Sequence, residues 1–324
     1  MPTMNMVQAV HQALEEEMER DENVLVLGED VGVGGGVFRA TDGFYKKFGP
    51  DRALDTPLSE LGIVAFAIGI ALYGMRPVAE IQFADFIHLA FDQIANNASH
   101  MCYRSAGTYH VPMVIRSPHG GGVRGGLEHS QSPEALFMNL PGIKIVIPST
   151  PYDTKGLLKS AVRDENPVIF FEHKGLYRAI TGEVPLDDYT IPIGEAKVLK
   201  EGTDVSIFAW SAMVHLAQQV LPTLEKEGVD AELVDLRTLL PLDRKAIVKS
   251  AAKTGRVVIV HEAPKTGGVG AEISAIIAEE ALDSMEAPIQ RVCGCDTPFP
   301  YALEKYYMPT AERILSAVRS AMSF

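Results

Sequence analysis

The sequence contains few cysteines, and their arrangement suggests neither a disulfide framework nor a zinc site. The three are Cys102, Cys293 and Cys295, and the last two are separated by one residue, too close for an easy disulfide. No histidine accompanies this pair at zinc-finger spacing. We therefore expect reduced thiols and an intracellular location. That location is the cytoplasm or, for a eukaryotic chain whose presequence has been removed, the mitochondrial matrix.

Long apolar runs and a secretion signal are also missing. The longest apolar run covers 63–75, which is too short to span a bilayer. The N-terminal stretch lacks the basic head and apolar core of a signal peptide. The formal net charge is −13, which disfavours nucleic acids and anionic membranes as partners. We expect a globular protein that binds neither a nucleic acid nor a membrane.

Several common catalytic motifs are absent. The glycine-rich stretch 28–36 lacks a Gly-Lys-Ser/Thr ending, and Val37 replaces the third glycine of a dinucleotide fingerprint. No Gly-x-Ser-x-Gly elbow marks a serine hydrolase. No His-x-x-x-His pair or carboxylate cluster has the spacing of metal ligands. The chain thus offers no nucleophile or metal centre of its own.

The pattern that is present is a double series of short apolar strands alternating with helical segments. Such alternation predicts parallel α/β sheets covered by helices on both faces. A length of 324 residues suits about two domains. A segment rich in proline, glycine and acidic residues separates the two series. We predict an α/β domain over 1–182, a linker over 183–203 and a second α/β domain over 204–324.

The stretch 55–60, Asp-Thr-Pro-Leu-Ser-Glu, holds the most informative carboxylate. Pro57 ends the preceding strand and Ser59 can cap a helix. The predicted helix 61–73 is apolar on all sides, which indicates a buried helix. Glu60 would then be a carboxylate at the start of a buried helix, and such a group takes up a proton or finds a partner. The simpler alternative is a first-turn glutamate favoured by the helix dipole.

Two further loops follow predicted strands, at the sheet edge where parallel α/β proteins bind ligands. One contains Gln82 and Phe86, and the other is the long glycine-rich loop 117–132. Of the histidines in the long loop, we favour His129, because a predicted helix start follows it closely, whereas His119 lies beside three glycines. A carboxylate, aromatic rings and a histidine without a nucleophile suit a cofactor that supplies the chemistry.

Five segments together resemble the beta subunits of the thiamine-diphosphate-dependent 2-oxo acid dehydrogenases, which form the decarboxylating component of the pyruvate and branched-chain multienzyme complexes. The segments are DTPLSE (55–60), EIQFADF (80–86), HSQSPEA (129–135), HEAPKTGG (261–268) and RVCGCDTPFPY (291–301). The resemblance extends in order over essentially the whole chain. It implies a pyrimidine-binding α/β domain followed by a transketolase-type C-terminal domain.

The resemblance also implies roles for individual residues. Glu60 would hydrogen-bond N1′ of the aminopyrimidine ring of thiamine diphosphate, with Phe86 packed on that ring and Gln82 nearby. A carboxyl group that shares a proton with N1′ promotes removal of the thiazolium C2 proton. His129 would lie near the thiazolium, the substrate and the incoming lipoyl group, and would act in acyl transfer.

Partners follow from the same resemblance. The chain has no Gly-Asp-Gly, the motif that in this enzyme class holds the diphosphate through a divalent metal. The resemblance therefore implies an alpha subunit that holds magnesium, in an assembly of two alpha and two beta chains. It further implies an acyltransferase core whose lipoyl group accepts the acyl product. A structural potassium site is expected at Asp164 and Asn166.

The expected substrate is a branched-chain 2-oxo acid. The motif that contains His129 and the two C-terminal motifs resemble those of branched-chain members more closely. Pyruvate is the alternative, because many branched-chain members have tyrosine where this chain has Phe86. A non-catalytic assembly subunit would not need Glu60, Phe86 and His129 together. A split transketolase would need basic residues for a sugar phosphate, and only Arg116 and Arg124 are obvious near the long loop.

Overall fold

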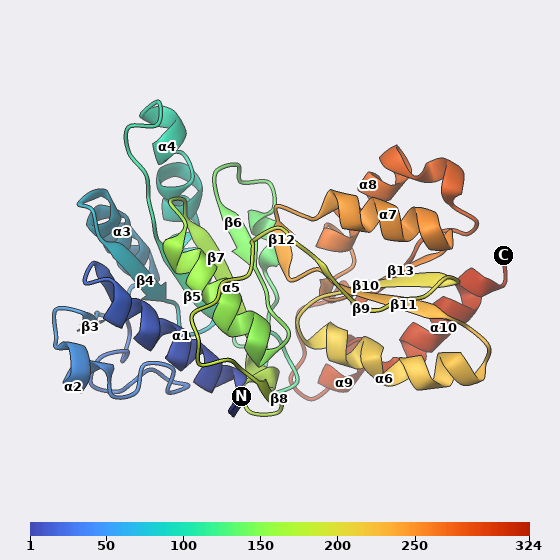
Figure 1. The fold of residues 1–324 in the computed structure, drawn as a ribbon, viewed down its shortest axis with the longest axis horizontal. Helices are drawn as coiled ribbons and strands as arrows, with labels where there is room; N and C mark the ends of the chain where they lie inside the picture. The colour runs from blue at the N-terminus through green and yellow to red at the C-terminus, as the bar shows by residue number, and fades with distance from the viewer. The chain divides into compact units, whose positions relative to one another are not determined.

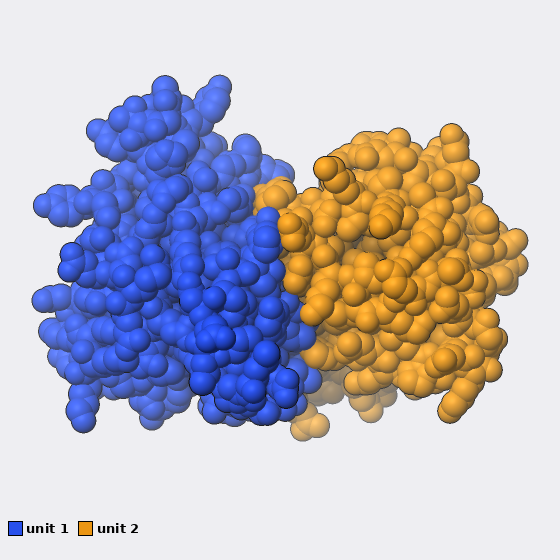
Figure 2. Space-filling model, in the orientation of Figure 1, with its two compact units in different colours: residues 1–120, 139–193 blue, residues 121–138, 194–324 orange.

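The structure is a computed structural model that describes residues 1–324, and the chain divides into two compact units (Figure 2). Unit 1 comprises 1–120 and 139–193, and unit 2 comprises 121–138 and 194–324. The segment 121–138 therefore belongs with the C-terminal part of the chain, although residues of unit 1 both precede and follow it in the sequence. Each unit is described separately below.

Unit 1 is built on a parallel sheet. Six of its strands lie in the order β6-β7-β5-β4-β2-β3, and each neighbouring pair is parallel. A separate antiparallel pair joins β1 and β8. The elements of this unit are β1 (Thr3–Asn5), α1 (Met6–Arg20), β2 (Val24–Gly28), α2 (Phe44–Phe48), β3 (Ala53–Asp55), α3 (Glu60–Leu72), β4 (Arg76–Glu80), η1 (Ala84–Ala90), η2 (Gln93–Ala98), α4 (Met101–Arg104), β5 (Val114–His119), β6 (Lys144–Val146), α5 (Pro151–Arg163), β7 (Val168–His173), η4 (Lys174–Leu176) and β8 (Thr181–Glu183).

Helices cover both faces of this sheet (Figure 1). On one face, α1 and α5 pack side by side, and their apolar residues share a core with alternate residues of β2, β4, β5, β6 and β7. On the other face, α3 contacts β4, η1 and η2. This is the two-faced α/β architecture that continuous apolar strands predict.

The burial of α3, the helix that starts at Glu60, differs from the prediction. Only part of α3 is buried, and its other side is apolar and exposed: Leu61 is 47% exposed and Phe66 53%. Tyr73, just after the helix, is 90% exposed. The expectation of a helix buried on all sides is wrong for the chain by itself, because the chain supplies contacts for only one face.

A second difference concerns the segment 86–103, which the sequence predicts as one helix. The structure has a 3-10 helix (η1), a π-helix (η2) and one short α-helical turn (α4). Side-chain hydrogen bonds recur here: Asn96 Nδ2 donates to Asp92 Oδ1 at 2.8 Å and Ser99 Oγ to the carbonyl of Ala95 at 2.6 Å. Asparagine, aspartate and serine side chains compete with regular helical hydrogen bonding, which accounts for the irregular segment.

Unit 2 contains a second sheet, in the order β14-β13-β10-β11-β9. The strands are parallel except β9, which pairs with β11 in the antiparallel sense and lies within the predicted linker 183–203. The elements are η3 (Glu134–Phe137), β9 (Lys197–Lys200), β10 (Val205–Ala209), α6 (Ala212–Lys226), β11 (Ala231–Asp235), β12 (Thr238–Leu240), α7 (Arg244–Thr254), β13 (Val257–Pro264), α8 (Val269–Glu280), η5 (Leu282–Ser284), β14 (Gln290–Gly294), α9 (Glu304–Tyr307) and α10 (Ala311–Met322).

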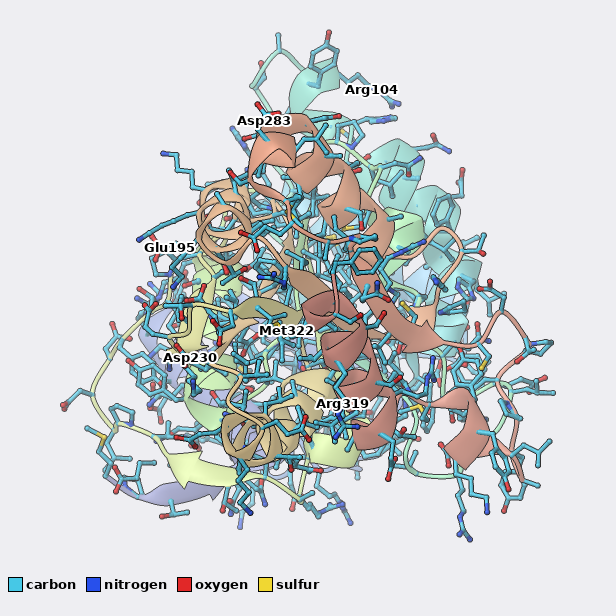
Figure 3. The ribbon with its side chains drawn as sticks, turned by 90° about the vertical axis from the view of Figure 1, so that its right-hand side faces the viewer. Arg104, Glu195, Asp230, Asp283, Arg319 and Met322 are labelled. Carbon is cyan, nitrogen blue, oxygen red and sulfur yellow. The ribbon has the colours of Figure 1, made fainter.

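In unit 2, α6 and α10 cover one face of the sheet, and α7 and α8 the other (Figure 1). Arg319 lies near the end of α10 (Figure 3). It donates to the carboxylate of Glu227, just after α6, at 3.0 and 2.5 Å. No helix of either unit combines the length and apolar character needed to cross a membrane.

Candidate functional site

Glu60 is the first residue of α3, as the capping pattern predicts. Ser59 caps the helix, and its Oγ accepts a hydrogen bond from the backbone N of Gly62 at 3.3 Å. The Glu60 side chain is buried, with 6% of its surface exposed. Its carboxylate forms no hydrogen bond or ion pair within the chain. Buried carboxylates are normally paired, so this group is a candidate for contact with a bound ligand.

A second acid lies near Glu60. Glu29 directly follows β2, and burial, followed by the charges of Glu60 and Asp30, raises the pKa of Glu29 above its ordinary value. Gln82, after β4, donates from Nε2 to the backbone carbonyl of Glu29 at 3.3 Å. The structure thus connects Gln82 with the loop that brings Glu29 near Glu60. Sequence reasoning missed Glu29, although it follows a buried parallel strand directly.

Phe86 lies on η1, and η1 packs against α3, the helix that begins with Glu60. The ring of Phe86 is half-buried and meets Phe83 edge-to-face, with centroids 6.0 Å apart. Phe83 in turn meets Phe38 edge-to-face at 5.7 Å. The aromatic side chains therefore support one another, and Phe86 has a defined orientation with part of its ring still accessible.

A buried ion cluster lies where the central strands of unit 1 end. Arg116 on β5 donates to Glu80 Oε2 at 2.7 Å, and to the Glu172 carboxylate at 2.6 and 2.7 Å. The hydroxyl of Tyr177 also donates to Glu172, at 2.5 Å. Burial raises the pKa of Glu80, although Arg116 opposes this effect. Because Arg116 is 1% exposed and fully paired, it is not available to bind a ligand.

The two histidines of the long loop have different environments. His119 is not in the loop but is the last residue of β5, where it is buried. Its ring meets Phe171 and His173 edge-to-face at 5.7 and 5.1 Å, and burial lowers the pKa of His119 well below its ordinary value. It is a neutral core histidine. His129, in contrast, is partly exposed within the segment 121–138 of unit 2.

The helix expected directly after His129 is only a 3-10 turn, η3. The predicted residues are therefore distributed over both units. Glu60, Gln82 and Phe86 come from neighbouring elements of unit 1, whereas His129 belongs to unit 2. Glu60 follows β3, Gln82 and Phe86 follow β4, and the elements that carry Glu60 and Phe86, α3 and η1, pack against each other.

Unit 2 has a buried cluster that the sequence did not reveal. Trp210 Nε1 donates to Glu134 Oε1 at 3.3 Å, and burial raises the pKa of Glu134 to about 8. The indole of Trp210 stacks on His261, with ring centroids 5.1 Å apart. Burial lowers the pKa of His261 to about 4, and its Nε2 lies 3.1 Å from Cys293 Sγ. At neutral pH the cluster therefore contains an uncharged acid and an uncharged histidine.

The residues expected to bind potassium do not fit that ion. The carboxylate of Asp164 pairs with Lys144 and accepts from the backbone N of Asn166 at 2.9 Å. Arg76 Nη1 donates to the carbonyl oxygens of Val162 and Asp164, at 3.1 Å each. Lys144 and Arg76 thus already contact the carboxylate and carbonyl oxygens at the end of α5, where the helix dipole favours a positive charge. We derive no role for potassium.

Comparison with known proteins connects both units to one family. The family model described as the transketolase pyrimidine-binding domain matches residues 2–180, and the transketolase C-terminal domain matches 194–314. The 2-oxoisovalerate dehydrogenase subunit beta of Bacillus subtilis (strain 168) is 53% identical over 100% of both chains. The chain belongs to the beta-subunit family of the 2-oxo acid dehydrogenases.

Other members of this family are nearly as similar. The mitochondrial 2-oxoisovalerate dehydrogenase subunit beta 2 of Arabidopsis thaliana is 50% identical, over 99% of this chain and 90% of its own length. The pyruvate dehydrogenase E1 component subunit beta of Bacillus subtilis is 50% identical over 100% of both chains. A solved structure titled "Split gene transketolase, inactive beta4 tetramer" matches with a TM-score of 0.81 and 29% identity, over 99% of this chain and 98% of that chain.

These findings confirm the predicted family and the predicted pair of α/β domains of transketolase type. Membership in the family implies dependence on thiamine diphosphate. The set Glu60, Gln82 and Phe86 fits that cofactor on physical grounds, because it offers a buried carboxylate without a hydrogen bond in the chain, an amide and a half-buried aromatic ring to a nitrogen-containing aromatic ring.

Proposed function

We propose that the chain, together with an alpha subunit, carries out oxidative decarboxylation of a 2-oxo acid and transfers the acyl group to the lipoyl group of an acyltransferase. The observation that carries the proposal is Glu60, a buried carboxylate at the head of α3 without a partner in its own chain. Thiamine diphosphate, when bound, supplies the nucleophilic carbon that attacks the 2-oxo group.

Glu60 would hold a proton at ring nitrogen N1′ of the cofactor. A buried carboxyl group is suited to this task, because enclosure strengthens the hydrogen bond to the ring and excludes water from it. The nearby Glu29 carries a raised pKa, to which the charge of Glu60 contributes, so the two acids are electrostatically coupled. Such coupling supports a role for Glu29 in setting the proton affinity of the site.

Phe86 and Gln82 would bind the same aminopyrimidine ring without proton chemistry. Phe86 is half-buried, and its ring is held in orientation by Phe83. Gln82 donates one hydrogen bond to the loop after β2 and is thereby fixed beside it. These side chains orient the ring so that Glu60 meets N1′ rather than another ring atom.

His129 would act on the substrate side, in transfer of the acyl group to the lipoyl arm. Its partial exposure on an irregular segment suits a residue that contacts a transient partner. His119 is excluded from this role by its burial.

For the substrate we propose branched-chain 2-oxo acids, with pyruvate as the alternative. The difference in identity between the two Bacillus subtilis relatives, 53% and 50%, favours the branched-chain reading only slightly. Phe86 in place of the tyrosine expected in many branched-chain members supports the alternative. A split transketolase is less well supported, because Arg116 is locked between Glu80 and Glu172 and leaves only Arg124 of the two expected phosphate-binding arginines.

The proposed assembly has two alpha and two beta chains docked to a lipoyl acyltransferase core, with magnesium held by alpha. The missing Gly-Asp-Gly motif supports an alpha partner, and so does the exposed apolar side of α3, which needs a covering surface. We propose the cytoplasm as the location, or the mitochondrial matrix in a eukaryotic host, since the Arabidopsis relative is named as mitochondrial.

The test is to co-express the chain with an alpha partner and assay the purified complex, with thiamine diphosphate and magnesium, against 3-methyl-2-oxobutanoate, pyruvate and a ketose phosphate. Activity on a 2-oxo acid only in the presence of alpha supports the proposal, and the ratio of kcat/KM values decides the substrate. Transfer of a two-carbon unit from the ketose phosphate, or full activity of the beta chain alone, would contradict it.

A further inference from the structure

Within the long loop, the segment 121–132, which carries His129, is attached at both ends to a single carboxylate. Its first residue is Gly121, whose backbone N donates to Glu262 Oε1. Its last residue is Ser132, whose Oγ donates to the same oxygen at 3.3 Å. Glu262 lies on β13 and is 5% exposed, so this oxygen is sheltered from competing water. A carboxylate oxygen can accept two hydrogen bonds, and here it closes the segment 121–132 into a ring.

The segment also depends on contacts made inside this ring. A Cβ added to Gly125 would lie 2.7 Å from the carbonyl oxygen and 2.9 Å from Cβ of His129. The backbone of Gly125 therefore packs directly on His129 and leaves no room for a side chain. Gly122 donates to Glu304 Oε1 at 2.6 Å, and Arg124 has φ of 56°, an unfavourable conformation that only a constrained loop maintains.

Four of the twelve residues in the ring are glycines, so its backbone would be highly mobile if it were released. The two hydrogen bonds to Glu262 remove much of this freedom where the segment begins and ends. We propose that Glu262 is the positioning residue for His129: it closes the 121–132 ring and thereby fixes the histidine for its reaction. Glu262 contacts the loop at Gly121 and Ser132, so the proposed effect on the reaction passes through His129.

The first experiment measures the loop itself and requires no enzyme activity. Arg124 is exposed and precedes Gly125, so trypsin can cut between them when the ring opens. In the full chain, Glu262→Ala should raise the initial rate of this cut by about 10-fold, as judged by mass spectrometry of the fragments. Glu262→Gln keeps an oxygen acceptor and should restore most of the protection. Glu272→Ala, an exposed acid in the first turn of α8, is the matched control and should leave the rate unchanged.

Ser132→Ala removes one of the two ring contacts and should raise the rate of cutting by a smaller factor than Glu262→Ala. This variant decides the question if Glu262→Ala does not fold. Cutting at the wild-type rate in Ser132→Ala, and also in Glu262→Ala if that variant folds, would overturn the proposal.

The second experiment tests the link to His129 and rests on the proposed function. In the complex with alpha, Glu262→Ala should lower the lipoamide-dependent kcat more than the rate with an artificial electron acceptor. The double variant Glu262→Ala/His129→Ala should lose no more than His129→Ala alone, because both changes remove one effect. Additive losses would overturn the positioning role. If the complex shows no 2-oxo acid activity at all, the proposed function fails, while the trypsin experiment still decides whether Glu262 closes the ring.

Discussion

The indole of Trp210 donates a hydrogen bond to a carboxyl group, that of Glu134, which keeps its proton at neutral pH. The two atoms are 3.3 Å apart and the side chain of Glu134 is 1% exposed. Burial raises the pKa of Glu134 to about 8, and the charge of Glu262 adds to this rise. Most native carboxyl groups stabilise a fold by being ionised, whereas this one is stable when neutral.

The contribution of Glu134 to stability should therefore depend on pH in the direction opposite to the usual one for an acid. The unfolded chain releases this proton near the ordinary pKa of 4.5, but the folded chain keeps it up to about pH 8. Between these values Glu134 holds its proton in the folded state but not in the unfolded state, so its contribution to the free energy of unfolding falls as the pH rises. Glu134→Gln, which is neutral throughout, should show a smaller fall in melting temperature between pH 5.5 and pH 8.5. Parallel curves for wild type and variant would contradict this assignment.

Glu60→Gln should abolish most catalysis without unfolding the protein. The amide has nearly the same shape and is easier to bury than a charge, but it cannot release and take up a proton. In the complex with alpha we expect a loss of ~10²–10⁴-fold in decarboxylation rate. Exchange of the C2 proton of bound thiamine diphosphate, followed by proton NMR, should slow by a similar factor. Ser59→Ala is the control: it weakens the helix cap by about 1 kcal/mol but leaves the carboxylate in place.

His129→Ala should separate the two half-reactions. The rate with lipoamide should fall much more than the rate with an artificial electron acceptor, because only acyl transfer to the lipoyl arm would need the imidazole. His110→Ala, which removes an exposed histidine of unit 1, should leave both rates unchanged. An equal loss of both rates in His129→Ala would assign the histidine to decarboxylation or substrate binding instead.

Phe66→Glu should weaken assembly with alpha while sparing the fold. Phe66 is 53% exposed on α3, so a charge there costs the isolated chain little, but it would be buried in the proposed interface. Sedimentation of mixed subunits should show an apparent Kd raised by about 10-fold or more. Leu186→Glu changes an exposed apolar residue away from α3 (64% exposed) and serves as control. Unchanged assembly of Phe66→Glu would place alpha elsewhere.

Arg76→Ala should destabilise unit 1, and the wild type should not respond to potassium. Arg76 satisfies carbonyls of Val162 and Asp164 at the end of α5, so its loss should cost about 1–3 kcal/mol of unfolding free energy. Arg76→Lys retains the charge but cannot reach both carbonyls equally and should be intermediate. Thermal unfolding in potassium chloride and in sodium chloride at equal ionic strength should coincide for the wild type. A higher melting temperature in potassium would contradict this arrangement.

Local patterns in the sequence predicted the elements that depend on local physics. Apolar runs bounded by glycine and proline placed the strands, and the cap at Ser59 placed the start of α3 to within one residue. His119 was misplaced because the glycines after it suggested a loop. Its strand continues to His119 because β7 runs alongside as far as His173 and pairs with it, a contact distant in sequence.

The other missed features also depend on tertiary contacts. Glu262 contacts Gly121 only because β13 and the 121–138 segment fold together within unit 2. The spacing of these residues in the sequence does not predict the contact. The apolar composition of α3 predicted that its surface is buried, but it could not show whether the chain itself or a partner would bury it. Apolarity indicates that a surface will be removed from water, and it does not indicate whether the chain itself or a partner removes it.

That distinction has a consequence for the life of the protein in a cell. If alpha covers α3 as proposed, a newly made copy presents Leu61 and Phe66 to the solvent until it assembles, and such a surface is what chaperones and quality-control proteases recognise. Surplus copies should therefore be short-lived. Balanced synthesis of the two subunits, rather than intrinsic stability, would then set how much of this chain accumulates.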